Sequence, residues 1–146
     1  MSDIRTGRCL CGSVTLRIAV QGGGVSACHC SQCRRWTGGG PLYSIRADVL
    51  ETTGEAAIAS YRHSGWGERT FCGTCGTTLY WRMQGRPVAY VAPGLLDDQD
   101  GLTMESEIFV DQRAPWMQLV DGTSRTTEAE ELAELEAFLE KEKADG

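Results

Sequence analysis

Seven cysteines, gathered in three short groups, constrain the fold of this chain more than any other feature of its sequence. The groups are Cys9-Leu10-Cys11, Cys28-His29-Cys30-Ser31-Gln32-Cys33 and Cys72-Gly73-Thr74-Cys75. Seven is an odd number, so disulfides alone would leave one thiol unpaired. A chain of 146 residues also buries about two-thirds of its surface on folding, so it does not need disulfides to hold a core. We therefore expect these cysteines to bind metal.

The ends of the chain and its charge bear on location and partners. Residues 1–6 carry no apolar run, and no stretch approaches the roughly 20 apolar residues of a membrane span. We therefore expect a soluble, cytoplasmic protein with reduced thiols and no membrane partner. The net charge of −6 comes from residues 128–145, which hold seven Glu, one Asp and two Lys, whereas residues 1–127 balance twelve acidic residues with twelve Arg. A nucleic-acid groove needs a basic excess, so no nucleic-acid partner is predicted.

The hydrophobic pattern predicts a single, mainly β domain over residues 1–146, with a body at 1–125. Apolar residues alternate with polar ones over 13–20, which is typical of a half-buried strand. Gly22-Gly23-Gly24 predicts a turn, and Ser31 to Trp36 one helical turn. Further short strands are predicted at 25–27, 42–45, 56–62, 77–82, 87–92 and 107–110.

The C-terminal segment has the pattern of an amphipathic helix over about 127–143. Thr127 and Glu130 have the spacing of a capping box. Leu132, Leu135 and Leu139 follow at helical spacing, with Phe138 beside them. This apolar face predicts packing on the body or on a second subunit, and hence a possible homo-oligomer.

The first and third cysteine groups together predict a structural zinc site. Structural zinc uses four protein ligands, and two pairs far apart in sequence supply four sulfurs. In an extended segment, residues two apart face the same way, so Cys9 and Cys11 are expected to share one ion. A Cys-x-x-Cys turn aims backbone amides at its sulfurs, and Gly76 permits the left-handed residue that such a turn commonly needs. Redox chemistry at Cys72 and Cys75 is the alternative, but no βαβ pattern surrounds them.

The central group predicts a second zinc with an open position. One loop presents Cys28, Cys30 and Cys33, and catalytic zinc typically has three protein ligands. Three thiolates make a soft, anionic centre, which favours a substrate thiol over hydroxide as the fourth ligand. Alternatively, His29 or His63 closes the site and makes it structural, although an extended loop would turn His29 away from the two cysteines beside it.

Two features next to the central group bear on substrate binding. Arg34 and Arg35 follow it directly, and a guanidinium there offsets the negative charge of the thiolates, binds a substrate carboxylate, or remains a surface charge. Gly38-Gly39-Gly40 is either a flexible loop or a place where the backbone approaches a ligand closely.

The cysteine motifs resemble those of the glutathione-dependent formaldehyde-activating enzyme family. The resemblance rests on Cys9-Leu10-Cys11-Gly12, on Cys28 to Arg34, on Phe71 to Gly76 and on Leu96-Asp97-Asp98. That family includes the domain of centromere protein V. It implies an Mss4-like fold, in which several coiled antiparallel sheets surround two zinc sites, here followed by the C-terminal helix. Where many members have a His before the last Trp-containing segment, this chain reads Glu105-Ser106-Glu107-Ile108.

The resemblance also implies a ligand set and an activity. The structural Zn²⁺ would be held by Cys9, Cys11, Cys72 and Cys75, and the catalytic Zn²⁺ by Cys28, Cys30 and Cys33. The expected function is that of a carbon–sulfur lyase with a small-molecule thiol and an aldehyde as partners, such as glutathione and formaldehyde. Arg34 would bind the thiol's carboxylate, and Tyr43, His63 or a bound water would supply a proton. The competing hypothesis is a non-enzymatic zinc module that binds a protein partner.

Overall fold

The computed structural model describes residues 2–145, which divide into two compact units. The first unit comprises residues 2–25 and 44–103, and the second comprises 26–43 and 104–145. Strand β2 (Thr15–Cys28) passes from the first unit into the second, and β3 (Leu42–Thr53) passes back. Among the described residues, no helix combines the length and the apolar character that crossing a membrane requires.

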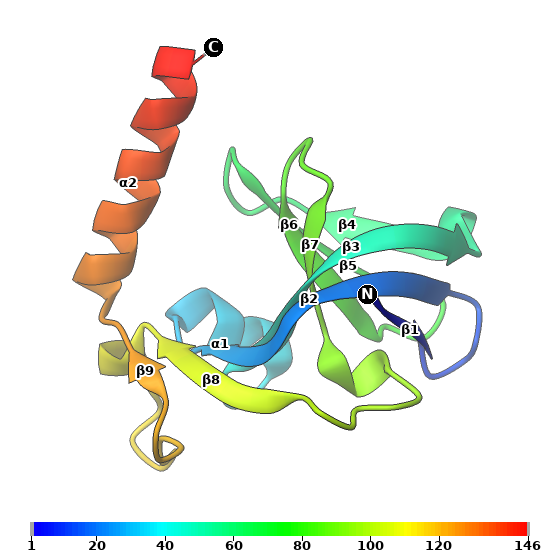
Figure 1. Ribbon diagram of the computed structural model, residues 1–146, viewed down its shortest axis with the longest axis horizontal. Helices are drawn as coiled ribbons and strands as arrows, with labels where there is room; N and C mark the ends of the chain where they lie inside the picture. The colour runs from blue at the N-terminus through cyan, green and yellow to red at the C-terminus, as the bar shows by residue number, and fades with distance from the viewer. Residues whose placement is uncertain (1, 146) are drawn as a thin grey trace. The chain divides into compact units, whose positions relative to one another are not determined.

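The first unit is built on strands that pair in the order β4-β5-β6-β7-β3-β2, with β1 pairing β2 (Figure 1). Its core consists of inward-facing aliphatic residues, and among them Leu16, Ile18, Ile45, Leu79 and Val91 are at most 1% exposed. Two 3-10 helices, η1 (Glu55–Ala57) and η2 (Pro93–Leu95), connect strands. The other strands of this unit are β1 (Asp3–Arg8), β4 (Ile58–Tyr61), β5 (Gly67–Cys72), β6 (Thr78–Met83) and β7 (Val88–Val91).

One prediction for the N-terminal part of the chain is wrong, and one strand there was not predicted. The predicted turn at Gly22-Gly23-Gly24 lies inside β2, which continues through it, with φ of 83° at Gly22 and 74° at Gly23. Glycine adopts these angles without steric cost, so the strand changes direction without ending. Strand β1 was not expected, because its side chains show no apolar alternation; it is held by backbone pairing with β2.

The second unit contains the end of β2, most of β8 and both α-helices. Its elements are α1 (Ser31–Thr37), β8 (Thr103–Ile108), the 3-10 helix η3 (Val110–Gln112), β9 (Ser124–Arg125) and α2 (Glu128–Asp145). Strands β8 and β9 pair in parallel, with Ser106 opposite Ser124. The chain between them, residues 109–123, is long enough for the crossover that a parallel pair needs. The fold is therefore mainly β with an open, mixed sheet and a C-terminal helix, and the expectation of antiparallel pairing throughout is wrong.

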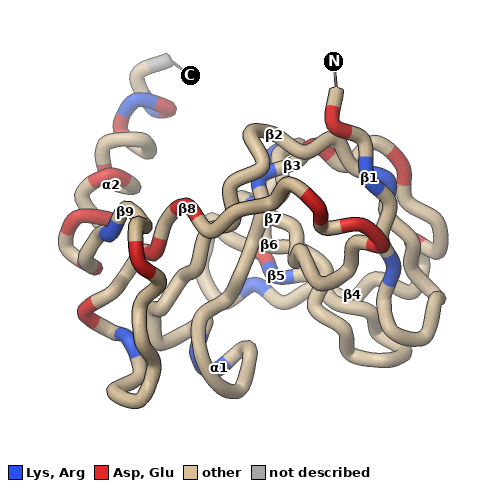
Figure 2. The backbone as a smooth tube through the Cα atoms, turned by 60° about the horizontal axis from the view of Figure 1, so that its bottom comes forward, with Lys and Arg blue, Asp and Glu red and all other residues tan. Residues whose placement is uncertain are grey.

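The C-terminal helix begins where the capping box predicted. The Thr127 N–H donates to Glu130 Oε1 at 3.3 Å, and the Glu130 N–H donates to Thr127 Oγ1 at 3.2 Å. Acidic residues recur along α2, as Figure 2 shows. On its apolar side Leu132 is 49% and Phe138 39% exposed. This chain therefore leaves that face partly uncovered, and a homo-oligomer stays a prediction.

Removing α2 is expected to leave metal binding intact, because the helix contains no Cys or His. Truncation after Thr126 keeps the two backbone hydrogen bonds of that residue, to Glu107 and Val110. It loses three others: those that join Glu128 to Asp111 and Gln112, and the one from the Thr126 hydroxyl to Glu131. At about 1 kcal/mol for each hydrogen bond, the free energy of unfolding should fall by about 3 kcal/mol. Chemical denaturation and metal analysis of the two proteins would check this. A lower metal content in the shortened protein would contradict the assignment of all ligands to residues before the helix.

Candidate metal centres

The first candidate centre lies in the first unit, where the sulfurs of Cys9, Cys11, Cys72 and Cys75 all lie within 4.8 Å of one another. The Sγ–Sγ distance is 3.7 Å between Cys9 and Cys11, and 3.8 Å between Cys11 and Cys72. All seven cysteines of the chain are free thiols. Four converging sulfurs that form no disulfide suit a tetrahedral zinc ion.

The N-terminal pair is brought together by a turn and not by an extended segment as expected. The Gly12 N–H donates to the Cys9 carbonyl at 3.1 Å, which closes the turn, and the Val14 N–H donates to Cys9 Sγ at 3.3 Å. The Leu10 N–H reaches Thr77 Oγ1 at 3.1 Å, which ties this turn to the segment after Cys75. The turn folds the Cys11 sulfur back toward Cys9, so proximity arises from local hydrogen bonding and not from strand alternation.

The second pair occupies a tight turn after β5. The Gly76 N–H donates to the Cys72 carbonyl at 2.7 Å, and Gly76 has the left-handed φ of 81° that was expected there. The Thr77 hydroxyl lies 3.1 Å from the Cys75 sulfur. Hydrogen bonds from the side chain and then the backbone N–H of Thr77 lower the pKa of Cys75 to about 5. A thiol held as thiolate at neutral pH is ready to bind a metal cation.

The second candidate centre lies in the second unit, where the sulfurs of Cys28, Cys30 and Cys33 lie within 4.8 Å of one another. Cys28 is the last residue of β2, Cys30 is the N-cap of α1, and Cys33 is the buried residue of that helix. The Cys33 N–H donates to Cys30 Sγ at 3.3 Å. Because the chain leaves a strand and enters a helix within this motif, three sulfurs that are near in sequence turn toward one point.

Hydrogen bonding among these thiols concentrates negative charge on one sulfur. The pKa of Cys30 falls to about 2, because the thiols of Cys28 and Cys33 donate to its sulfur and outweigh burial, with help from the backbone N–H groups of Cys33 and Gln32. The same interactions with Cys30 and Cys33, together with burial, raise the pKa of Cys28. The donor set of three sulfurs with a thiolate at Cys30 fits a zinc ion. Within residues 2–145, no His, Asp or Glu belongs to this group.

The two histidines lie elsewhere than in the metal-compatible groups. His29 is 1% exposed, and its Nε2 lies 3.1 Å from Oε1 of Glu107, which is also buried. His63 is exposed, and its Nδ1 lies 3.4 Å from the Tyr61 hydroxyl. The sequence analysis did not identify Glu107 as a functional residue. One signal could have identified it: Glu107 is a charged residue in a predicted strand, at the point where this chain departs from the family pattern.

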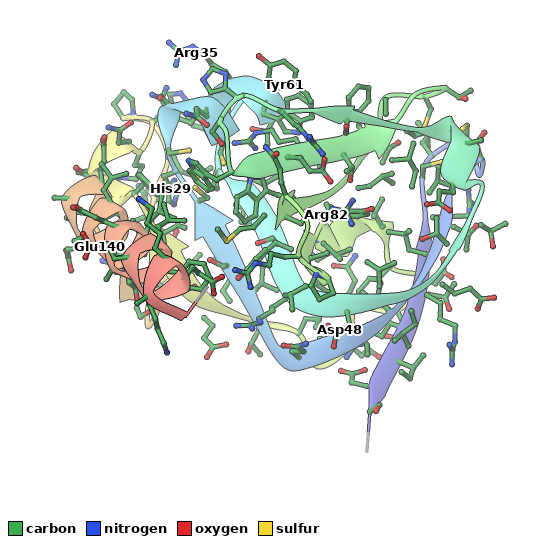
Figure 3. All side chains as sticks on the ribbon, turned by 90° about the horizontal axis from the view of Figure 1, so that it is seen from above. His29, Arg35, Asp48, Tyr61, Arg82 and Glu140 are labelled. Carbon is green, nitrogen blue, oxygen red and sulfur yellow. The ribbon has the colours of Figure 1, made fainter. Side chains whose placement is uncertain are left out.

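A hollow of about 440 Å³ adjoins α1 and is lined by Arg34, Arg35, Gly38, Gly39 and Trp116. The Trp116 side chain is 68% exposed. The Arg34 Nε is buried without a hydrogen-bond partner among the described residues, whereas Arg35 is exposed and points outward (Figure 3). The hollow therefore combines two cations with an uncovered aromatic ring.

The glycine segment after α1 has separate local roles. Gly38 is the left-handed C-cap of the helix, and its N–H donates to the Arg34 carbonyl at 3.0 Å. A Cβ on Gly40 would lie 2.5 Å from the terminal methyl carbon of Met117, so the close approach there is to a side chain of this protein. Met117 closes a turn with Ala114, which carries Trp116 to the hollow.

Comparison with known proteins places these motifs in a family. A sequence model described as "Glutathione-dependent formaldehyde-activating enzyme" matches residues 4–112, well over half of the chain. An uncharacterized lyase of Schizosaccharomyces pombe is 27% identical over 123 residues, which cover 83% of this chain and 89% of the relative. A crystal structure of a Rhodobacter sphaeroides protein has a similar fold, with a TM-score of 0.54 at 21% identity over 84% of this chain and 99% of its own. The chain belongs to the glutathione-dependent formaldehyde-activating enzyme family.

Proposed function

We propose that this protein is a carbon–sulfur lyase that forms or cleaves thiol–aldehyde adducts, such as S-(hydroxymethyl)glutathione from glutathione and formaldehyde. The family membership supports this reaction class, as does the name "lyase" carried by the Schizosaccharomyces pombe relative. The observation that carries the proposal is the group of Cys28, Cys30 and Cys33, which offers three sulfurs and no fourth ligand from the described residues.

We propose a structural zinc site in the first unit and a catalytic zinc site in the second. Cys9, Cys11, Cys72 and Cys75 would hold a structural zinc in a single domain of the Mss4-like type. Cys28, Cys30 and Cys33 would hold a second zinc, which when bound supplies a positive centre that lowers the pKa of a substrate thiol. The three sulfurs make that site soft and anionic, so it favours a thiolate over hydroxide or carboxylate.

The addition needs no oxidant or reductant. The thiol loses its proton, a carbon–sulfur bond forms to the carbonyl carbon, and the carbonyl oxygen gains a proton. Tyr43, which lies in the same unit as Cys28 and is 44% exposed, is the side chain proposed to supply that proton, with bound water as the alternative donor. His63 belongs to the other unit, and its Nδ1 lies 3.4 Å from the Tyr61 hydroxyl, so it is not proposed as the donor.

The hollow is proposed to bind the remainder of the thiol. It is an open surface hollow of about 440 Å³. Arg34 directly follows Cys33, and its guanidinium is suited to a carboxylate. Trp116 offers an uncovered apolar face to the carbon chain of the ligand. Glutathione, a thiol that carries carboxylates, matches this combination.

Cobalt substitution tests the proposed function directly. Glutathione added to the cobalt-substituted protein should intensify the sulfur-to-metal charge-transfer band, and S-methylglutathione should not, because it lacks the thiol. Arg34→Ala should weaken the glutathione titration by about 1–3 kcal/mol, since a charge-assisted hydrogen bond is lost. Arg17→Ala is the matched control, because Arg17 is exposed on β2 in the first unit. If glutathione leaves the cobalt spectrum unchanged, the proposed chemistry is excluded, and a zinc module that binds a protein partner is favoured.

A further inference from the structure

His29 lies between two proposed metal ligands in sequence, yet its ring belongs to a different interaction. Its backbone N–H donates to the Ile108 carbonyl at 2.9 Å, which anchors the residue beside the end of β8. The ring is 1% exposed, with Nε2 3.1 Å from Glu107 Oε1, while Nδ1 is buried and makes no hydrogen bond to any residue between 2 and 145. In Cys₃His sites an imidazole nitrogen is the fourth zinc ligand, so a buried imidazole between two proposed ligands is a candidate for that position.

Glu107 is itself held from several sides. Its Oε2 accepts hydrogen bonds from the Thr123 hydroxyl at 2.7 Å and from the Val120 N–H at 3.0 Å. Its backbone pairs with β9 opposite Arg125. The carboxylate therefore cannot follow His29 if the ring turns; it is a fixed acceptor that can hold the ring in one orientation.

We propose that Glu107 is a positioning residue that keeps His29 out of the ligand set of Cys28, Cys30 and Cys33, and so leaves one position there for the substrate thiol. This inference rests on the proposed function in one respect: the proposed function assigns the open position to a substrate thiol. Without Glu107, the buried ring loses its acceptor, and a metal ion held by the cysteines on either side of it in sequence would offer an imidazole nitrogen a new partner. The site would then become a closed Cys₃His site, which binds metal but excludes substrate.

The same geometry makes the pair an unsuitable proton donor to the substrate. Both residues are at most 2% exposed, and Oε2 of Glu107 already accepts hydrogen bonds from Thr123 and Val120. Its Oε1 contacts the imidazole of His29. Its effect is therefore expected in access to the fourth ligand position.

The test compares cobalt-substituted variants and reads glutathione binding and histidine ligation separately. Glu107→Leu should need more glutathione to develop the charge-transfer band, because the thiolate must then displace an imidazole ligand; we expect a factor of at least about 10, the lower end of the losses in metal affinity or activity seen when partners around metal sites are changed. It should also show a hyperfine-shifted imidazole N–H signal in the proton NMR spectrum. The chain has two histidines, so a His63→Gln background assigns that signal to His29. The double variant Glu107→Leu/His29→Leu should recover the glutathione response and lose the signal.

Glu105→Leu is the matched control, because Glu105 lies on the same strand but is exposed. If Glu107→Leu does not fold, Glu107→Gln takes its place: its amide is a weaker, neutral acceptor, so a smaller shift that His29→Leu removes is expected. The proposal is overturned if neither variant shows a shift that depends on His29, or if the double variant stays unresponsive. A different result would contradict the proposed function: glutathione would fail to intensify the charge-transfer band of the unaltered protein. In that case the imidazole N–H signal of Glu107→Leu would still test the role of Glu107.

Discussion

Cys72→Ser is expected to leave the protein unfolded at room temperature, or to lower its stability by several kcal/mol. Cys72 is fully buried at the end of β5, and its sulfur lies 3.8 Å from that of Cys11, which follows β1. If this group holds the proposed structural zinc, the binding free energy is also folding free energy, about 10–16 kcal/mol for zinc-finger peptides. That equals or exceeds the roughly 5–15 kcal/mol by which domains are stable. Cys9→Ser, at another fully buried cysteine proposed as a ligand, should have the same effect.

Circular dichroism melting with zinc analysis of the same samples would measure this effect. Thr74→Ser is the matched control, because Thr74 lies in the same turn, is exposed, and is not a proposed ligand. Chelator treatment of the unaltered protein should reproduce the loss of structure. A Cys72→Ser protein that melts cooperatively near the temperature of the unaltered protein would show that this group does not hold the fold together.

Cys30→Ser is expected to give the opposite combination, a folded protein with one zinc fewer and little activity. Cys30 caps α1 through its sulfur, and serine is a preferred N-cap residue whose hydroxyl can accept the same hydrogen bond from the Cys33 N–H. The helix should therefore persist while the proposed metal loses a thiol whose pKa is lowered by its neighbours. Because even partners outside the ligand set change activity by 10–100-fold, loss of a ligand should lower turnover more than about 100-fold.

Metal analysis, melting curves and a formaldehyde–glutathione assay would decide this second case. Gln32→Ala, an exposed neighbour in the same helix, should retain zinc, stability and turnover. Should Cys30→Ser unfold as readily as Cys72→Ser, the division into a structural and a catalytic centre would be wrong.

Several elements were predictable because their causes are local. The helix start at Thr127 follows from a four-residue hydrogen-bonding pattern, and α1 follows from a cap and a glycine stop. Family membership could also be predicted from short motifs, because the cysteine spacings can be read directly from the sequence without knowledge of the fold. By contrast, the parallel pairing of β8 and β9 depends on the path of residues 109–123, which carry no pattern that reveals where they return.

The grouping of the sulfurs shows the same division between local and distant causes. The sequence alone was sufficient to expect that Cys28, Cys30 and Cys33 converge, since six residues cannot separate them far. The sequence also predicted that the sulfurs of Cys9 and Cys11 lie together, but it predicted an extended segment there. In the structure a turn closed by Gly12 brings the two sulfurs together. Local hydrogen bonding can override the simple alternation of side chains that sequence patterns assume.

What the sequence determined by itself is the inventory of thiols, their spacing and the family to which they belong. What only the tertiary structure decided is the environment of each group: that His29 turns to Glu107, 78 residues away, and that Trp116 lies beside Arg34 in a hollow. These contacts join segments with no pattern in common. They form because burying an imidazole requires a polar partner, and which partner comes within reach depends on how the whole chain folds.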